Sequence, residues 1–432
     1  MLDRASISTV ALSVGVGLSV GYAISQKQLQ AASKLCSKGN AAAAAEASSD
    51  EVERLIRPNI LRLAPYRCAR DDYDQGILLD ANENSLGPPL PATHPELPEH
   101  LERYPCPYQR GLKQELADFR NGSEHRGVVK PENIFLGVGS DEAIDLLIRV
   151  ACTPRVDSIL ITPPTYGMYE VCANIHDVDI IRVPLKVTRP ESNLNGLKSG
   201  EPMPSFHIDP QEILRAVTPQ TKLVFLCSPG NPTANSLRVE DIEVILNDSS
   251  YKGFVVVDEA YIDFTSTPSM CTLVNKHKRL VVLQTLSKGF GLAGIRLGSA
   301  FGNPRLVQIL NNVKAPYNIN KLTAKVALEA IRNKDLLSEK VQLICKERSR
   351  VMDELRRKPF VRCIYASDSN FVLFQVPHAL EIYKTMADRG VVIRYRGSQL
   401  NLKDCLRATI GSPEENDRML ELLTEIAGEL NA

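Results

Sequence analysis

Short apolar runs that alternate with helical segments dominate the middle of the chain. The runs that we interpret as strands occupy residues 133–138, 158–162, 179–183, 223–227, 254–257 and 280–283. They lack the polar alternation of a strand that faces water on one side, so we expect them to be buried on both faces. The helical segments between the runs could supply that cover. The sequence therefore predicts an α/β fold with a mostly parallel central sheet covered by helices.

The pattern changes from about residue 334 onward. A long helical stretch (335–358) precedes two strands (361–365 and 370–374) and a helix (379–389). Two further strands (391–394 and 405–410) and a last helix after Ser412 follow. This order predicts a smaller α+β domain. The predicted organisation is an N-terminal extension (1–50), an arm that packs with the small domain (51–120), a large domain (121–333) and the small C-terminal domain (334–432).

Charge and cysteine usage argue against several classes of function. The 51 Lys and Arg residues equal the 51 Asp and Glu residues, so no overall field attracts nucleic acid or an anionic membrane. The ten cysteines are scattered, with no CxxC and no paired spacing with histidine, as is typical of reduced thiols in a reducing compartment. We expect a cytoplasmic protein that binds small molecules, with no metal site and no nucleic-acid partner.

The first fifty residues differ in composition from the rest of the chain. Residues 5–24 carry no charge, but five of these twenty are Ser or Thr and three are Gly, which makes at most a weak membrane anchor. Apart from Asp3, no acidic residue precedes Glu46, as in a cleaved targeting segment for mitochondria or another organelle. A disordered tail is a third interpretation. The sequence leaves the three open and favours the anchor least.

Polar side chains follow three of the predicted strands at the point where each strand ends. Asn231 follows one strand, Asp258 and Tyr261 follow the next, and Lys288 follows a third. Each alone has an ordinary explanation as a turn asparagine, a structural carboxylate, a packed tyrosine or a surface lysine. In parallel sheets, however, ligands bind beyond the carboxyl ends of the strands. A lysine held there between small residues is suited to form a Schiff base with a carbonyl group.

An aldehyde cofactor with a pyridine ring and a phosphate would explain this set of residues. Asp258 would pair with the ring nitrogen, Asn231 and Tyr261 would hydrogen-bond the phenolic oxygen, and Tyr166 would stack on the ring. Groups suited to the phosphate lie on either side of the lysine and at a predicted helix start, where we expect Ser140 to be the N-cap. They are Ser140, Asp141, Ser287 and Arg296.

Nine motifs carry a resemblance to a known family. They are LLDANENSLGP, RYPCPYQRGLK, GVGSDEAIDLLIR, PPTYGMYEVCA, CSPGNPT, VVVDEAYIDF, LQTLSKGFGLAGIRLG, APYNIN and CLRATIG. From about Arg57 to its end, the chain resembles the fold-type-I aminotransferases that depend on pyridoxal 5'-phosphate. Within that group it resembles the histidinol-phosphate aminotransferases, most closely the fungal ones.

The resemblance implies an activity and a set of site residues. The reaction would be transamination of L-histidinol phosphate with 2-oxoglutarate, with Lys288, Asp258 and Tyr261 as catalytic residues. The enzyme would be a homodimer in which Tyr104 reaches the cofactor phosphate of the other subunit. The resemblance also implies substrate contacts: Arg407 would bind the acidic end of either substrate, with Arg394 and Asn82 as further contacts.

The chain departs from the common family pattern at two positions. Ala234 occupies a turn position where glycine is usual, and alanine tolerates a positive φ poorly. Gly289 follows the lysine where a serine or a bulkier residue is frequent.

Other functions fit the same residues. An aromatic amino acid aminotransferase or a threonine-phosphate decarboxylase would share Lys288, Asp258 and Asn231. A regulatory module that binds the cofactor without catalysis is the alternative from another class.

Overall fold

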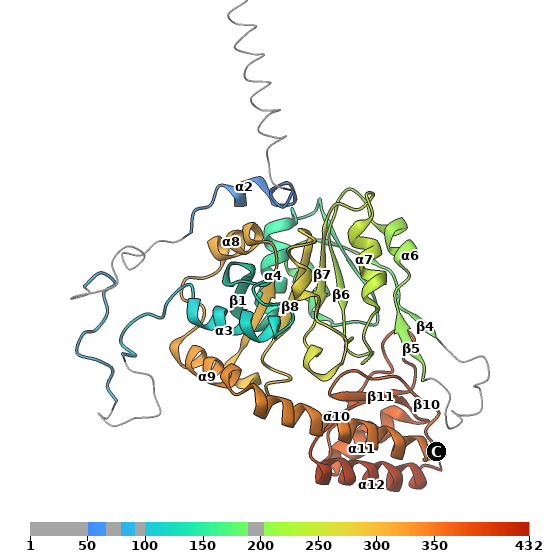
Figure 1. Ribbon diagram of the computed structural model, residues 1–432. Helices are drawn as coiled ribbons and strands as arrows, with labels where there is room; N and C mark the ends of the chain where they lie inside the picture. Colours follow the sequence, from blue (N-terminus) through green and yellow to red (C-terminus); the bar gives the residue numbers. More distant parts are fainter. Residues whose placement is uncertain (1–50, 66–78, 91–99, 189–202, 432) are drawn as a thin grey trace, which may run out of the picture. The chain divides into compact units, whose positions relative to one another are not determined.

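A computed structural model gives the structure of the chain and describes residues 51–65, 79–90, 100–188 and 203–431 (Figure 1). Residues up to Arg54 and residues from Leu55 onward are separate units, and the second contains all that follows. The three interpretations of residues 1–50 lie outside the described residues and stay predictions. Within the described ranges, no helix is both long enough and apolar enough to cross a membrane.

The large sheet is mostly parallel, as the sequence predicts. Its seven strands are β1 (Ile134–Val138), β2 (Ser158–Ile161), β3 (Asp179–Arg182), β6 (Thr221–Cys227), β7 (Phe254–Asp258), β8 (Leu280–Thr285) and β9 (Leu297–Phe301), in the order β1-β9-β8-β7-β6-β2-β3. Only β9 runs against its neighbours β1 and β8, and the other pairs are parallel. The carboxyl ends of β6, β7 and β8 therefore meet at one edge of the sheet.

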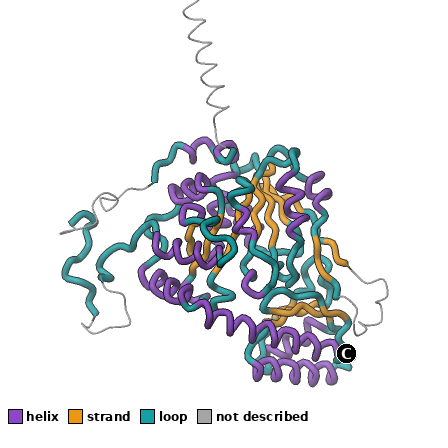
Figure 2. Tube along the Cα trace, viewed as in Figure 1, coloured by secondary structure: helices purple, strands orange, loops and turns teal. Residues whose placement is uncertain are grey.

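Helices cover this sheet, so its strands lie between them (Figure 2). The helices of this part of the chain are α2 (Pro58–Leu61), α3 (Arg110–Asn121), α4 (Gly139–Ala151), α5 (Met168–Ile175), α6 (Pro210–Ala216), α7 (Val239–Asn247), α8 (Pro304–Val313) and α9 (Lys321–Arg332). Buried residues of α3, α6 and α7 share one core with alternate residues of the strands, such as Leu160, Val224 and Val255. The intervening strand residues, which are also buried, point to the opposite face.

A second sheet follows in the chain. It is antiparallel and contains β10 (Cys363–Ile364), β11 (Phe371–Gln375), β12 (Arg394–Tyr395) and β13 (Cys405–Thr409), in the order β10-β11-β13-β12. Its core includes residues of α10 (Lys334–Arg356), α11 (Ala379–Asp388) and α12 (Pro413–Glu429), which lie beside it (Figure 1). The order of these elements agrees with the prediction, and the boundaries at residues 120 and 333 stay predictions. An antiparallel pair of β4 (Lys186–Thr188) and β5 (Ser205–His207) completes the strands of the described residues.

The antiparallel strand β9 fixes the loop that contains Lys288. Thr285 at the end of β8 is paired with Gly298 in β9, and the Leu286 N–H donates to the Leu297 carbonyl at 3.1 Å. Residues 286–296 therefore form a loop that is closed at its base, directly beyond the carboxyl end of β8.

Gly298 lets β9 pass the start of α4 at close range. A Cβ atom at this position would collide with the backbone of Gly139 and Ser140. Backbone atoms cannot rotate away as a side chain can, so the first turn of α4 is fixed against β9. The sequence does not predict this strand, because Gly298, Ser299 and Ala300 lack an apolar pattern.

We expect Gly298→Ala to destabilise the protein by about 1–3 kcal/mol, the usual cost of overpacking a core. Urea unfolding followed by circular dichroism measures this change. Gly428→Ala in α12 is the matched control, because no atom lies within 4 Å of the added Cβ. Equal stability of the two variants would contradict the close packing of β9 on α4.

Candidate active site

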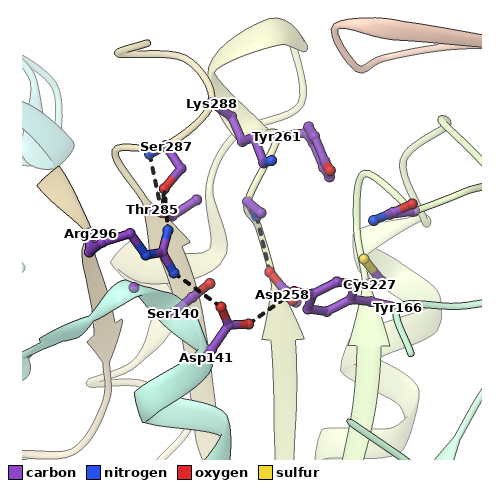
Figure 3. A pocket seen from close by; sticks show the side chains of 13 residues that line it. Ser140, Asp141, Tyr166, Cys227, Asp258, Tyr261, Thr285, Ser287, Lys288 and Arg296 are labelled. Carbon is purple, nitrogen blue, oxygen red and sulfur yellow. Dashed lines mark hydrogen bonds and ion pairs between the residues drawn. The ribbon is translucent and has the colours of Figure 1, made fainter. Parts of the chain in front are cut away.

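The structure brings the predicted catalytic residues together in one pocket at the carboxyl ends of β6, β7 and β8 (Figure 3). The residues that line it are Gly139, Ser140, Asp141, Tyr166, Cys227, Asn231, Asp258, Ala260, Tyr261, Thr285, Ser287, Lys288 and Arg296. Of the residues predicted to bind the cofactor, all but Tyr104 are in this set.

Lys288 is half-buried in the loop between β8 and β9. Its Nζ atom lies 5.7 Å from the centre of the Tyr261 ring, and its backbone carbonyl accepts a hydrogen bond from the Gly291 N–H at 3.0 Å. Burial lowers the pKa of the lysine below its ordinary value, and the positive charge of Arg407 lowers it further. The neutral amine, which is the form that can act as a nucleophile or accept a proton, is thus more accessible than in a surface lysine.

Asp258 is a buried carboxylate at the end of β7, with 2% of its surface exposed. Its Oδ2 accepts a hydrogen bond of 2.7 Å from the Tyr169 hydroxyl, and its Oδ1 accepts one of 3.2 Å from the Ala260 N–H. Burial raises the pKa of this carboxyl to about 6, although both hydrogen bonds oppose the rise. The nearby Lys288 also lowers this pKa, whereas Asp141 raises it. A cationic N–H partner would stabilise the ionised form.

Tyr169 is a site residue that the sequence reasoning missed. It is fully buried in α5, and its ring stacks on Phe225 with centroids 4.8 Å apart. The edge of Tyr166 lies against it at 5.6 Å. Its hydroxyl holds the Asp258 carboxylate in place. Its position three residues after Tyr166 in PPTYGMYE was the available signal, because that spacing puts both rings on one side of a helix start.

One side of the pocket is suited to an anion. Arg296 Nη2 lies 3.4 Å from Asp141 Oδ2, and Arg296 Nη1 lies 3.5 Å from Ser287 Oγ (Figure 3). The first turn of α4 begins here at Gly139, whose φ is +73°, and a Cβ atom there would lie 2.6 Å from Arg296 Nη2. Glycine thus lets the guanidinium approach the helix start, where free N–H groups attract negative charge.

The expectation that Ser140 is the N-cap of α4 is wrong. The helix begins one residue earlier, at Gly139, and the N-cap residue Val138 makes no side-chain capping bond. Ser140 instead lies in the first turn and lines the pocket. The Gly139 N–H donates to the Arg296 carbonyl at 3.0 Å, and the N–H groups that follow it in this first turn are suited to a ligand.

Arg407 connects the second sheet to the pocket. Its Nη1 donates a hydrogen bond of 2.6 Å to Asn231 Oδ1, and its guanidinium lies 5.0 Å from the centre of the Phe371 ring. Tyr261 contacts the same ring edge to face at 5.1 Å. The Arg407 Nε atom is buried and has no hydrogen-bond partner, so the guanidinium has donors to spare.

Four predicted residues are not among those that line the Lys288 pocket, and of these Arg407 is joined to it by its hydrogen bond to Asn231. Tyr104 and Asn82 line a second pocket, which shares no residue with the first. Tyr104 is 51% exposed and stacks on Tyr317 with centroids 4.7 Å apart. Arg394 is exposed on β12, directly across from Arg407 on β13. In one copy of the chain, Tyr104 and Asn82 are therefore apart from the lysine.

The structure accommodates both departures from the family pattern. Ala234 has a φ of +70°, and its carbonyl accepts a hydrogen bond of 2.8 Å from Ser369 Oγ, so the turn keeps its left-handed residue with alanine. A Cβ atom at Gly289 would lie 2.6 Å from the Asp263 Cβ. Asp263 forms an ion pair of 2.7 Å with Arg120, and glycine leaves room for it.

Comparisons with known proteins decide the family. The model of the family "Aminotransferase class I and II" matches residues 74–423. A histidinol-phosphate aminotransferase of Candida maltosa is 45% identical over 402 residues, which cover 88% of this chain and 99% of that protein. The chain belongs to the histidinol-phosphate aminotransferase family. It is an aminotransferase that depends on pyridoxal 5'-phosphate, and the predicted family, fold class and cofactor are confirmed.

Two further relatives agree with this assignment. The histidinol-phosphate aminotransferase of Saccharomyces cerevisiae is 41% identical over 394 residues, which cover 87% of this chain and 97% of that protein. The crystal structure of the Sinorhizobium meliloti histidinol-phosphate aminotransferase in complex with pyridoxal-5'-phosphate has a TM-score of 0.63 at 21% identity. The match covers 87% of this chain and 98% of that one, and at this identity it supports the fold alone.

We expect Asp258→Asn to stabilise the cofactor-free chain by up to about 3 kcal/mol at pH 8, because a pKa raised from 3.8 to about 6 makes ionised Asp258 costly in the fold. The gain is largest above the folded pKa, shrinks as the pH falls and disappears below the unfolded pKa of 3.8. Tyr169 can donate to or accept from the new amide. Urea unfolding between pH 4 and pH 8 measures the difference.

The matched control for this experiment is Asp248→Asn. Asp248 is only partly buried, and its pKa is lowered by its hydrogen bonds with Ser250, so this variant should bring no gain at pH 8. If Asp258→Asn were no more stable than the wild type at pH 8, the burial cost assigned to Asp258 would be wrong.

Proposed function

We propose that the chain transfers an amino group from L-histidinol phosphate to 2-oxoglutarate, which yields imidazole-acetol phosphate and L-glutamate in histidine biosynthesis. The observation that carries the proposal is one pocket that joins a half-buried lysine of lowered pKa, a buried carboxylate and an arginine at a helix start. The family assignment gives the substrate. The reaction is reversible, and in its biosynthetic direction glutamate is the amino donor.

The residues of the pocket fit pyridoxal phosphate. The anion side, with Ser140, Ser287 and Arg296, suits the phosphate. Asp258, which is buried with few donors around it, suits a protonated ring nitrogen. We propose that Asn231 and Tyr261 hydrogen-bond the phenolic oxygen of the cofactor and that Tyr166 packs against its ring. Asp141 is a further proposed contact, and it is held by Tyr166 and Arg296.

Lys288 is the group that we propose to move protons at the substrate. When bound, the cofactor supplies a ring that withdraws electrons from the substrate Cα. The neutral Lys288 Nζ then accepts the Cα proton and can return it, which its lowered pKa favours. Asp258 holds the proton at the ring nitrogen. Burial raises the pKa of Tyr261 above its ordinary value, so its hydroxyl stays protonated and donates.

Arg407 is the residue that we propose to bind the acidic end of either substrate. Asn231 holds one of its nitrogens, and Phe371 supports the plane of the guanidinium. The remaining donors suit a carboxylate or a phosphate, which arginine binds with two parallel hydrogen bonds. Arg394 lies across from Arg407 on the neighbouring strand and could add charge.

We further propose that the enzyme acts as a homodimer in which Tyr104 binds the cofactor phosphate of the other subunit. In support, Tyr104 and Asn82 line a pocket that is separate from the Lys288 pocket of the same chain. Tyr104 is held by its N–H, which donates to Glu83 Oε1 at 2.7 Å, while half of its surface is exposed to a partner.

We expect Lys288→Ala to lower the rate of amino transfer at least about 10²- to 10⁴-fold, the usual contribution of a positioned proton-transfer group. The measurement is the spectral change of the bound cofactor when histidinol phosphate is added. Lys276→Ala is the matched control, because Lys276 is exposed and pairs with Glu243 on the surface, so its rate should stay at the wild-type value. A near wild-type rate for Lys288→Ala would refute the role of this lysine.

A screen of amino donors tests the substrate. Histidinol phosphate, glutamate, phenylalanine and threonine phosphate are compared by kcat/KM with the wild-type enzyme, and histidinol phosphate should exceed the last two. A preference for phenylalanine or threonine phosphate would favour the related enzymes of this fold. Absence of turnover with all four would favour a regulatory module that binds the cofactor without catalysis.

Mixing two inactive variants tests the position of Tyr104. If Tyr104 acts across the dimer, a mixed dimer of Lys288→Ala and Tyr104→Phe has one site with both wild-type residues. We therefore expect denaturation and joint refolding to restore activity above that of either variant refolded alone. If Tyr104 acted within its own subunit, no mixed site would be intact and the activity would stay low.

A further inference from the structure

A buried ion pair lies against the loop that carries Lys288. Arg120 Nη1, near the end of α3, lies 2.7 Å from Asp263 Oδ1, and the two side chains are only 10% and 6% exposed. Asp263 belongs to a short helical turn (Ile262–Phe264) that follows Asp258 and β7 in the chain. A pair buried to this degree depends on both partners, because removal of one leaves the other charge uncompensated.

Asp263 is in contact with the residue that follows Lys288. A Cβ atom added to Gly289 would lie 2.6 Å from the Asp263 Cβ and would also collide with the Asp263 carboxylate. The backbone of Gly289 therefore packs directly against this side chain. Arg120 donates a hydrogen bond to one carboxylate oxygen and so keeps the Asp263 side chain in its place.

A second contact joins α3 to the same loop. The ring of Phe119 meets the ring of Phe290 edge to face, with centroids 5.4 Å apart. The Arg120 guanidinium lies 4.7 Å from the centre of the Phe119 ring. Both phenylalanines pack against the core of the large sheet. The residues that follow Lys288 are thus held from two neighbouring positions of one helix.

Arg120 also acts on a second buried carboxylate, that of Glu259, which directly follows Asp258. Burial raises the pKa of Glu259, whereas its hydrogen bonds and the charge of Arg120 oppose that rise. Burial lowers the pKa of Arg120, but the charge and the hydrogen bond of Asp263 outweigh burial and raise this pKa above its ordinary value. One guanidinium therefore stabilises two carboxylates of the segment that follows β7.

The ion pair lies outside the pocket, so its effect on Lys288 comes through position. Neither Arg120 nor Asp263 is among the residues that line the pocket. Burial and then the charge of Arg407 lower the pKa of Lys288, and the pair is not among the main charged groups that shift it. What the pair determines is the place of the loop, and with it the place of the Lys288 amine.

We propose that Arg120 and Asp263 are positioning residues, whose ion pair fixes the loop so that Lys288 Nζ stays where it can exchange a proton with the substrate. This inference rests on the proposed function of Lys288. Misplacement of a reacting group by about 1 Å can lower a rate about 100-fold. Because the pair lies outside the pocket, it contributes to kcat and not to KM.

The test is Asp263→Asn in the holoenzyme, because asparagine keeps the shape of the side chain and removes its charge. We expect kcat with histidinol phosphate to fall about 10- to 100-fold and KM to change less than about threefold. Hydrogen–deuterium exchange read by mass spectrometry should become faster in the peptide of residues 286–296, where the Gly291 and Leu292 N–H groups are hydrogen-bonded within the loop. Peptides of β11 and β13 should keep the wild-type rate of exchange.

Two further variants separate position from stability. Arg120→Lys keeps the charge without the planar fork, so its kcat should fall less than that of Arg120→Gln. The double variant of Arg120→Gln with Asp263→Asn has no charge at this contact, and its two amides can form a hydrogen bond there. We therefore expect kcat of the double variant to exceed that of Arg120→Gln alone.

Asp177→Asn is the matched control, because Asp177 is exposed and its ion pair with Arg155 lies on the surface. Its kinetics and exchange should equal those of the wild type. If urea unfolding showed Asp263→Asn to be less stable while kcat and exchange in the loop stayed unchanged, the pair would be structural only and the inference would be overturned. Faster exchange in all peptides alike, or a raised KM with unchanged kcat, would also overturn it.

Exchange in the loop separates a failure of this inference from a failure of the proposed function, because it needs no substrate. If the wild type did not use histidinol phosphate, the proposed function would fall. Faster exchange confined to residues 286–296 of Asp263→Asn would still support the anchoring of the loop by the ion pair. Exchange equal to that of the wild type would overturn the inference in either case.

Discussion

The burial of one carboxylate governs the chemistry of this site. Asp258 lies at the end of β7 beneath the pocket, and two hydrogen bonds, from Tyr169 and Ala260, only partly offset its loss of water. Ionised Asp258 therefore destabilises the folded protein when no cofactor is bound. The same carboxylate is a favourable partner for a protonated ring nitrogen. Burial of Asp258 thus lowers the stability of the fold, but it also leaves the carboxylate charge available to pair with the cofactor.

Positive charge is divided between two ends of the pocket. Arg296 stands at the start of α4, on the large sheet, where a cofactor phosphate would lie. Arg407 comes from the second sheet, where the acidic end of a substrate would lie. Burial, together with repulsion from Arg407 and Arg296, lowers the pKa of Lys288. The arginines that would bind the cofactor phosphate and the substrate anion thus also favour the neutral form of the Lys288 amine.

Much of the fold and of the site follows from the sequence, for a physical reason. Parallel strands bring their carboxyl ends to one edge, so Asn231, Asp258 and Lys288 had to lie near one another once the strands were located. The resemblance adds Arg407, Arg394 and the substrate. The roles of these residues and the dimer contact of Tyr104 stay predictions, since position alone does not establish them.

What the sequence did not reveal depends on contacts between distant segments. Tyr169 and Asp258 are 89 residues apart, and only the packing of α5 against the sheet joins them. The strand β9 contains small residues whose burial comes from α4 and from its neighbours, so no periodic pattern marks it. The error at Ser140 is local, because the helix begins one residue earlier, at Gly139, which has a positive φ.

The most direct measurement of the central claim is to locate the lysine that holds the cofactor. The holoenzyme is reduced with borohydride, digested and analysed by mass spectrometry for a phosphopyridoxyl group. The account predicts this group on the peptide that contains Lys288, in proportion to the bound cofactor. A modified lysine elsewhere, with Lys288 unmodified, would contradict it.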